Sequence, residues 1–303
     1  MLSAAGVWFG YVEEKPVLRG VTISVPRGGL VGILGPNGSG KTTLLRLLAG
    51  TRHPQRGVVT LDGAPLSGLS RGALARRMAV VPQETQLAFD YTVAEVAMMG
   101  RYAHLGPFEI EGPSDIAVVD ETLASTGTLH LKDRPFATLS GGEKQRVVIA
   151  TALAQVFRVS SSLRLKAEAT PPDPTGATHP DPTPDPCSFR LQPEDAAGYL
   201  LLDEPTASLD LGYQLEVAAL LKRLHEERGV AIVISTHDLA LAGSLCERVL
   251  LIRDGEVVAE GTADEALTPA NVRKVYGVDV DIVRHASGRR VLVPTGRSEP
   301  GSA

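Results

Sequence analysis

Residues 30–50 read LVGILGPNGSGKTTLLRLLAG, and the order of parts in this stretch decides the fold. The apolar run 30–34 predicts a buried strand, and the leucines of 42–50 recur at helical spacing until Gly50 ends the pattern. Between them lies a glycine-rich loop. Such a loop lets backbone N–H groups converge on a phosphate at the positive end of the following helix. The stretch therefore predicts an α/β fold with a phosphate-binding loop.

The loop 35–42 also carries the side chains that a nucleotide site needs. Its sequence, GPNGSGKT, has Gly35, four further residues, and then Gly40, Lys41 and Thr42. Lys41 supplies a positive charge to the terminal phosphates, and the Thr42 hydroxyl is placed to bind Mg²⁺. We therefore expect a magnesium–nucleotide site at this loop.

Other strands and helices are predicted from short apolar runs bounded by glycine or proline. The expected strands lie at 21–25, 58–63, 79–83, 198–204, 230–235 and 248–252. Helices are expected at 213–228 and near 269–276, and hairpin turns at 254–255 and around 287–288. Because parallel strands joined by helices form an open sheet covered on both faces, we expect a mixed, largely parallel sheet with an antiparallel edge.

Changes of composition predict how the chain is divided. From about residue 92 to 154 helical patterns replace strand patterns, which indicates a helical subdomain inserted into the core. The segment 156–195 has eight prolines between Pro171 and Pro193. It buries too little apolar surface to offset its ordering entropy, so we expect a disordered loop, with a polyproline ligand for a partner as the alternative. The expected parts are a core (1–88 and 196–262), a helical subdomain (89–155), the Pro-rich insert (156–195) and a C-terminal extension (263–303).

The bulk composition excludes several classes of protein. With 303 residues the chain is expected to form one elaborated domain or two lobes. Its net charge of −5, without clusters of Lys and Arg, argues against a nucleic-acid surface. The sequence has no secretion signal and no apolar run near the ~20 residues that cross a bilayer, so we expect a soluble, intracellular chain. The two cysteines, Cys187 and Cys246, are expected to be free thiols.

Polar residues at the ends of apolar strands predict the rest of the site. In YLLLDEP (199–205), Asp203 follows a buried run, where a carboxylate is costly unless it faces a cation or hydrogen-bond donors. Asp203 is therefore the expected outer ligand of Mg²⁺, and Glu204 is expected to polarise the attacking water. His237 and Gln83 also follow apolar strands. We expect His237 to contact the γ-phosphate, and Gln83 to sense the metal and the water. A purely structural role at a strand end is the alternative for each.

The stretch LSGGE (139–143) predicts a second helix start that accepts an anion. Ser140 and Glu143 have the spacing of a capping box. Capping alone is one interpretation. Two glycines are poor helix formers, however, and indicate a close approach by another group. The helix N-terminus would then form half of a second anion site.

Taken together, these motifs resemble those of the ATP-binding cassette (ABC) ATPases. GPNGSGKT resembles the Walker A motif, LSGGE the family signature, and VVPQ (80–83) the Q-loop. YLLLDEP resembles Walker B, SLD (208–210) the D-loop, and STHD (235–238) the switch-histidine motif. The resemblance covers residues 5–285 in family order. It implies a P-loop NTPase core of the RecA-like type that hydrolyses ATP with Mg²⁺.

The resemblance also implies a dimer in which two cassettes dock head to tail. The signature residues would then contact the nucleotide held at Lys41 of the other copy. An aromatic upstream is expected to stack on adenine, and Tyr11 fits best, with Trp8 and Phe9 as neighbours. The expected nucleotide contacts are Tyr11, Gly35, Pro36, Asn37, Gly38, Ser39, Gly40, Lys41, Thr42, Thr43, Ser140, Gly141, Gly142 and Asp210. The expected metal-binding residues are Thr42, Gln83 and Asp203, and the catalytic ones Glu204, His237 and Gln83.

Two further stretches are similar to one subgroup, the cassettes of importers for ferric siderophores, haem and cobalamin. They are VAMMGRYAHLG (96–106), with its GR-x-x-H pattern, and 275–294 near the C-terminus. Generic helix packing is the alternative for the first. The resemblance implies a separate membrane permease, a substrate-binding protein and a peripheral location on the cytoplasmic face of the membrane. An exporter cassette and a DNA-repair or translation ATPase are the competing hypotheses. The Pro-rich insert mildly favours haem as the ligand.

Overall fold

A six-stranded sheet forms the centre of the molecule. The computed structural model describes residues 1–12, 14–85, 89–157, 198–207, 209–284 and 290–297. The strand order is β10-β9-β3-β8-β7-β6, and all neighbours pair in parallel except β9 and β10. The strands are β3 (Leu30–Leu34), β6 (Met78–Val81), β7 (Tyr199–Asp203), β8 (Ala231–Thr236), β9 (Arg248–Arg253) and β10 (Glu256–Thr262). The expectation of a mixed, largely parallel sheet is confirmed.

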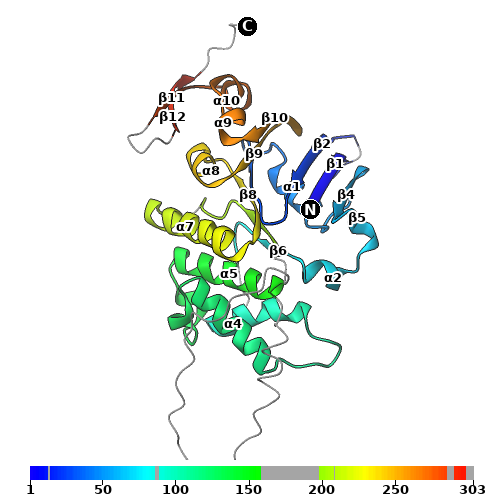
Figure 1. The fold of residues 1–303 in the computed structure, drawn as a ribbon, viewed down its shortest axis with the longest axis vertical. Coiled ribbons are helices and arrows are strands. Elements are labelled where there is room, and N and C mark those ends of the chain that lie inside the picture. The colour runs from blue at the N-terminus through cyan, green and yellow to red at the C-terminus, as the bar shows by residue number, and fades with distance from the viewer. Residues whose placement is uncertain (13, 86–88, 158–197, 208, 285–289, 298–303) are drawn as a thin grey trace, which may run out of the picture.

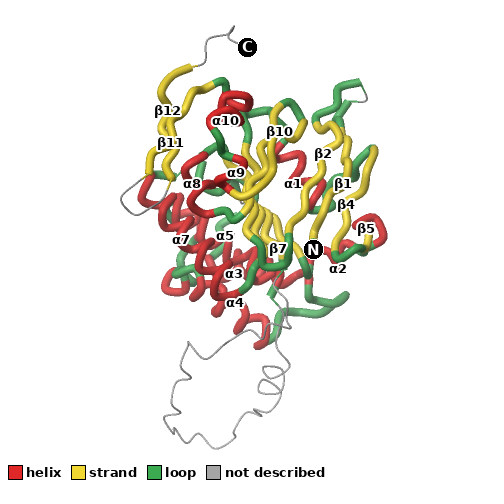
Figure 2. The backbone as a smooth tube through the Cα atoms, turned by 45° about the horizontal axis from the view of Figure 1, so that its top comes forward, coloured by secondary structure: helices red, strands yellow, loops and turns green. Residues whose placement is uncertain are grey.

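A second, antiparallel sheet lies beside the first, with the order β2-β1-β4-β5. Its strands are β1 (Leu2–Phe9), β2 (Leu18–Val25), β4 (Arg56–Leu61) and β5 (Ala64–Pro65). The segments 21–25 and 58–63, predicted as strands, belong to this sheet rather than to the central one. Figure 2 shows helix α1 (Lys41–Leu48) between the two sheets, where its four leucines join both in one apolar cluster.

The described residues 89–157, which follow β6, are mostly helical. They contain α3 (Val93–Met98), α4 (Pro113–Ser125) and α5 (Gly141–Val156), with short 3₁₀ turns at Met99–Ala103, Leu129–Leu131 and Phe136–Thr138. These helices gather at one end of the molecule (Figures 1 and 2). Residues 158–195 of the Pro-rich insert lie outside the described residues.

Helix α7 (Leu211–Arg228) fixes this helical end to the core. Arg228 pairs with Glu121 of α4 at 2.5 Å, and Arg223 donates to the Ser125 carbonyl at 2.6 Å. Arg146 of α5 pairs with Glu216 of α7. The polar ties add to an apolar cluster that α5 and α7 share with the central sheet.

The GR-x-x-H pattern in 96–106 has a structural explanation. A Cβ at Gly100 would lie 2.2 Å from the Thr151 carbonyl, so only glycine allows this approach to α5. Arg101 is 1% exposed; it pairs with Asp115 at 2.9 Å and donates to two carbonyls at the C-terminal end of α5. His104 bonds a third carbonyl there at 2.8 Å, and burial lowers its pKa. The pattern therefore caps α5, whose last carbonyls have no partner within the helix.

The C-terminal part completes the fold, together with two short elements that precede β6. Asp254 and Gly255 both have positive φ, and they form the predicted hairpin turn between β9 and β10. The other elements are α2 (Arg71–Ala75), a 3₁₀ turn (Leu66–Gly68), α8 (Leu239–Leu245), α9 (Ala263–Ala266), α10 (Pro269–Tyr276), β11 (Val278–Arg284) and β12 (Arg290–Arg297). Strands β11 and β12 pair antiparallel, which fits the second predicted hairpin, although its turn lies outside the described residues.

Two expectations about the whole chain can be compared with the described residues. Cys246 is a free, buried thiol, and burial raises its pKa to about 12; Cys187 lies outside them. Within the described ranges, no helix has the length and apolar character needed to cross a membrane.

Arg101→Ala should lower the free energy of unfolding by about 3–5 kcal/mol, because it leaves the Asp115 carboxylate and two α5 carbonyls buried without their partner. Urea denaturation measures the loss. Lys132→Ala is the matched control, since its ion pair with Asp120 is exposed and is worth under ~1 kcal/mol. Equal effects of the two substitutions would contradict the capping role of Arg101.

Candidate functional site

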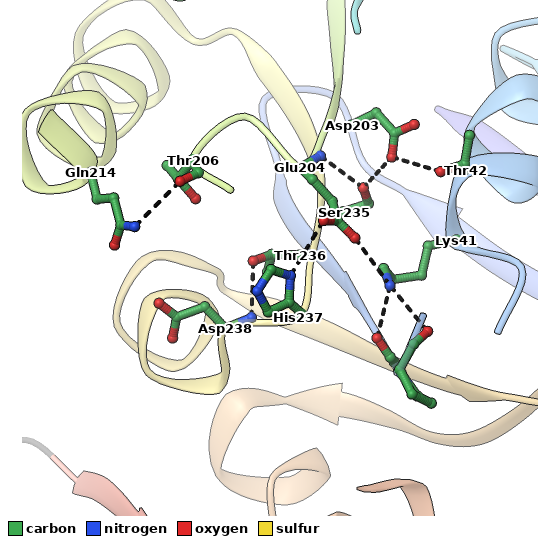
Figure 3. A network of polar contacts seen from close by, with 12 residues as sticks. Lys41, Thr42, Asp203, Glu204, Thr206, Gln214, Ser235, Thr236, His237 and Asp238 are labelled. Carbon is green, nitrogen blue, oxygen red and sulfur yellow. Dashed lines mark hydrogen bonds and ion pairs between the residues drawn. The ribbon is translucent and has the colours of Figure 1, made fainter. Parts of the chain in front are cut away.

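The register of the central strands brings the predicted motifs to one edge of the sheet. Leu34 of β3 is paired with Thr236 of β8, and Asp203 of β7 with Ser235 of β8. The carboxyl ends of the three strands are therefore level with one another. The phosphate loop, the carboxylates and the histidine that follow these strands meet there (Figure 3).

The phosphate loop has a backbone that side chains would disturb. Gly38 and Gly40 have φ of 80° and 106°, in the left-handed region that favours glycine. A Cβ at Gly35 would lie 2.1 Å from the Ile252 carbonyl of β9. Lys41 is 5% exposed and donates to the carbonyls of Gly35 at 2.8 Å and Pro36 at 3.2 Å. The loop is thus closed around a buried ammonium group.

Asp203 and Thr42 form the oxygen-rich part of the site. Asp203 Oδ1 accepts hydrogen bonds from Thr42 Oγ1 at 3.0 Å and from Ser235 Oγ at 2.6 Å. Carboxylate and hydroxyl oxygens are ligands that Mg²⁺ prefers. Ser235, the first residue of the STHD motif, was not among the predicted site residues.

Glu204 lies at the centre of the polar network in Figure 3. Its Oε1 is 3.2 Å from Lys41 Nζ and its Oε2 is 3.3 Å from His237 Nδ1. The side chain of Glu204 is 14% exposed, whereas that of His237 is 55% exposed, so the histidine faces the solvent side. Glu204 has φ of 46°, which is uncommon outside glycine, and its N–H donates to both the carbonyl and the hydroxyl of Ser235 at 3.1 Å.

The signature forms the capped helix start that the sequence predicts. Ser140 Oγ accepts from the Glu143 N–H at 3.3 Å, and Glu143 accepts from the Ser140 N–H at 2.8 Å, which lowers the Glu143 pKa. The two glycines predicted a close approach by another group, and at Gly142 that group belongs to the same chain. A Cβ there would lie 2.2 Å from the ring of Tyr213 in α7. Gly141, by contrast, is exposed.

Two other predicted residues lie outside the network of Figure 3. Gln83 is exposed, two residues beyond the end of β6. Asp210 is exposed at the start of α7 and its side chain does not cap that helix. Ser208 of the D-loop is not among the described residues. Gln214 of α7 donates to the carbonyls of Thr206 and Leu209, which fixes the segment that precedes Asp210.

Tyr11 is distinguished from the neighbouring aromatics by its contacts. Its hydroxyl lies 3.3 Å from Thr43 Oγ1 and accepts from Arg46 at 3.1 Å, and both partners belong to α1. The ring of Phe9 meets it edge-on, with centroids 5.1 Å apart, and the Arg52 guanidinium lies 6.0 Å from its centroid. Phe9 is buried, and Trp8 lies against Arg56. Tyr11, 51% exposed, is therefore the aromatic held against the phosphate-loop helix.

Comparison with known proteins identifies the family of the chain. Residues 18–160 match the family model described as ABC transporter. The chain is 37% identical over 272 residues to the hemin import ATP-binding protein HmuV of Bordetella avium. The aligned residues make up 89% of this chain and 90% of that protein. This chain belongs to the ATP-binding proteins of ABC transporters. As a member of this family it is an ATPase, and the resemblance inferred from its motifs is confirmed.

Two further matches agree with this assignment. The chain is 35% identical to the cobalamin import ATP-binding protein BtuD of Halobacterium salinarum, over 88% of this chain and 56% of that protein. A dimeric bacterial ABC transporter cassette, MJ0796, superposes with a TM-score of 0.62 at 26% identity, over 87% of this chain and 99% of that one. The ABC fold and the binding of ATP therefore belong to this chain.

Tyr11→Ala should raise the Kd for ATP about tenfold, because base–aromatic stacking is worth ~1–3 kcal/mol. Tyr11→Phe keeps the ring and should raise it less than about threefold. Trp8→Ala is the matched control and should leave the Kd unchanged. Fluorescence titration with an ATP analogue measures all three Kd values. A larger effect of Trp8→Ala than of Tyr11→Ala would show that Trp8, and not Tyr11, stacks on the base.

Proposed function

We propose that this chain is the ATP-hydrolysing subunit of an importer and that Glu204 is the residue that activates water. The carrying observation is the placement of Glu204 between Lys41 and His237, 3.2 and 3.3 Å away, beside the Asp203–Thr42 pair. A carboxylate in this position can take a proton from water next to the γ-phosphate. His237 donates to the carboxylate or to the phosphate and keeps Glu204 oriented.

The residues of the loop fit ATP with Mg²⁺. Ser39 is 2% exposed and its hydroxyl has no hydrogen-bond partner among the described residues, so a polar group is available inside the loop. Lys41 would bind the β- and γ-phosphates, and the loop amides would bind the phosphate oxygens. Thr42 would hold Mg²⁺ directly, with Asp203 behind it and Gln83 reaching it from the segment that follows β6. The metal would neutralise the charge that develops on the phosphoryl oxygens.

The site is completed by a second copy of the chain. Ser140 and Gly141 lie at the exposed start of α5, a 16-residue helix whose N-terminus favours an anion. The start of α5 belongs to the helical end of the molecule, whereas Lys41 belongs to α1, which lies beside the sheets. A head-to-tail dimer would bring the start of α5 of each copy to the γ-phosphate of the other. Asp210 would lie at the same interface.

A permease is the expected membrane partner. Four large apolar or aromatic side chains between β6 and α4 are strongly exposed, namely Phe89 (72%), Tyr102 (58%), Phe108 (106%) and Ile110 (82%). Exposed apolar groups gathered in one segment mark protein contacts. We assign this segment to a cytoplasmic helix of the permease, which would hold the ATPase at the inner face of the membrane. A substrate-binding protein would deliver the ligand from the other side.

Haem is the ligand that we propose, and cobalamin and ferric siderophores are the alternatives. Support comes from the 37% identity to a hemin import protein over 89% of the chain, compared with 35% to a cobalamin import protein. Ligand choice is a property of the permease and the binding protein. Uptake by cells is therefore the measurement that decides the ligand.

Glu204→Gln should lower kcat at least 100-fold, because it removes the base, while ATP remains bound. Since hydrolysis reopens the proposed dimer, size-exclusion chromatography with ATP and Mg²⁺ should show a stable dimer of this variant. Glu227→Gln, an exposed glutamate of α7, is the matched control and should behave as the wild type. Hydrolysis by Glu204→Gln at the wild-type rate would refute the assigned base.

Deletion of the gene should abolish uptake of labelled haem and leave uptake of labelled cobalamin and ferric siderophore intact. The wild-type chain should restore haem uptake and Lys41→Ala should not, because it cannot bind the phosphates. Loss of one of the other two uptakes instead would replace haem by that ligand. Accumulation of a compound in the deletion strain would identify an exporter.

A further inference from the structure

The turn between β9 and β10 contacts the phosphate loop, and the proposed mechanism does not use this contact. The Gly255 N–H donates to the Ser39 carbonyl of the loop at 3.1 Å. The Gly255 carbonyl accepts from the Arg19 N–H, near the start of β2, at 2.8 Å. Strands β10 and β2 lie side by side (Figures 1 and 2). One residue of the turn therefore joins the phosphate loop to a strand of the second sheet.

Glycine is required at position 255 for two reasons. Its φ is 79°, in the left-handed region that favours glycine. A Cβ would also lie 2.1 Å from the Val17 carbonyl, which is closer than a carbon atom can approach. The same carbonyl would lie 3.2 Å from a Cβ at Gly40. The Val17 carbonyl is thus enclosed between the turn and the phosphate loop, and three stretches of backbone meet at this point.

The hydrogen bond from Gly255 fixes the direction of one peptide unit in the loop. In a trans peptide the carbonyl and the N–H of the next residue point to opposite sides. Because the Ser39 carbonyl is directed at Gly255, the Gly40 N–H is directed away from the turn. Gly40 is the N-cap of α1, and the first N–H groups of a helix have no partner within it. The bond therefore keeps an amide of the phosphate loop available to a phosphate.

A second turn in the described part of the chain has the same backbone but lacks this contact. Asp62 and Gly63, between β4 and β5, have φ of 54° and 83°. The corresponding values for Asp254 and Gly255 are 50° and 79°. Both turns join antiparallel strands through two residues with positive φ. A Cβ at Gly63, however, would meet nothing within 4 Å. The two glycines therefore allow a matched comparison.

We propose that Gly255 is a positioning residue of the ATP site, whose N–H holds the Ser39 carbonyl and so keeps the Gly40 N–H directed at the phosphate. This inference goes beyond the proposed function, because it gives the turn between β9 and β10 a part in nucleotide affinity. It depends on ATP binding, but not on the dimer, the catalytic base or the imported ligand.

Gly255→Ala tests the contact. The added methyl group has no space beside the Val17 carbonyl, so the turn must move and its N–H must leave Ser39. We expect the Kd of the full-length chain for a fluorescent ATP analogue, and its KM for ATP, to rise about threefold to tenfold, the effect of one hydrogen bond. We expect kcat to change less than about twofold, because the bond serves binding rather than the chemical step.

Gly63→Ala is the matched control. It places the same methyl group at an equally unfavourable φ, so it should also lower the melting temperature. It should leave the Kd and KM for ATP unchanged, because this turn has no contact with the phosphate loop. An unchanged Kd in Gly255→Ala, or an equal rise in both variants, would overturn the proposal.

Amide exchange in the unaltered chain tests the proposal even if Gly255→Ala does not fold. Coupling between two sites is reciprocal, so a nucleotide that needs the positioned loop must also stabilise the bond that positions it. Saturation with a non-hydrolysable ATP analogue and Mg²⁺ should therefore slow deuterium exchange of the Gly255 amide at least about threefold. Exchange of the Gly63 amide should not change. Exchange at Gly255 that the nucleotide does not slow would refute the positioning role.

Discussion

The site depends on the register in which β3, β7 and β8 are paired. Side chains alternate between the two faces of a sheet, so a slip of one residue in β7 would turn Asp203 away from Thr42. The register is held by burial. Every residue of β3 and β8 is buried, and in β7 only the last, Asp203, is partly exposed. Apolar runs covered on both faces leave polar groups no place except the strand ends, and the chemistry is gathered there.

Glu204 illustrates how the scaffold holds a residue in an unfavourable conformation. A positive φ at a non-glycine residue costs of the order of 1–3 kcal/mol and persists where neighbours over-determine it. Here the N–H is bound to two acceptors of Ser235, and the two carboxylate oxygens face Lys41 and His237. The backbone bonds at Ser235 thus aim the carboxylate at the phosphate loop. Ser235 also binds Asp203, so one serine aligns both acids.

Features encoded locally could be predicted from the sequence. The strand–loop–helix unit around Lys41, the turn at Asp254 and Gly255, and the capping box of Ser140 and Glu143 each follow from residues close together in the chain. The parallel sheet was also predictable, since it follows from the alternation of apolar runs and helices.

Features that depend on distant partners could not be predicted. Strand β1 includes two alanines and Gly6, which are poor strand formers, and it is stabilised by pairing with β2 and β4. The need for glycine at position 142 comes from Tyr213, 71 positions along the chain, and no local pattern indicates it. Tyr11 could be chosen among the three aromatics by its spacing from the motifs, but its contacts with Thr43 and Arg46 of α1 depend on the fold.

The contact between Gly142 and Tyr213 has a mechanical consequence. Helix α7 begins a few residues after Glu204, and its Tyr213 ring fills the space that a side chain at position 142 would occupy. Since the Arg146–Glu216 ion pair holds the same two helices together, a displacement of α7 would be transmitted to the start of α5. The start of α7 is close in the chain to Glu204 of the same copy, and it also contacts the start of α5, which in the proposed dimer faces the nucleotide of the other copy. In such a dimer, ATP hydrolysis in one site would shift the start of α5 that completes the other site. The two sites would then be coupled through the packing of α7 on α5.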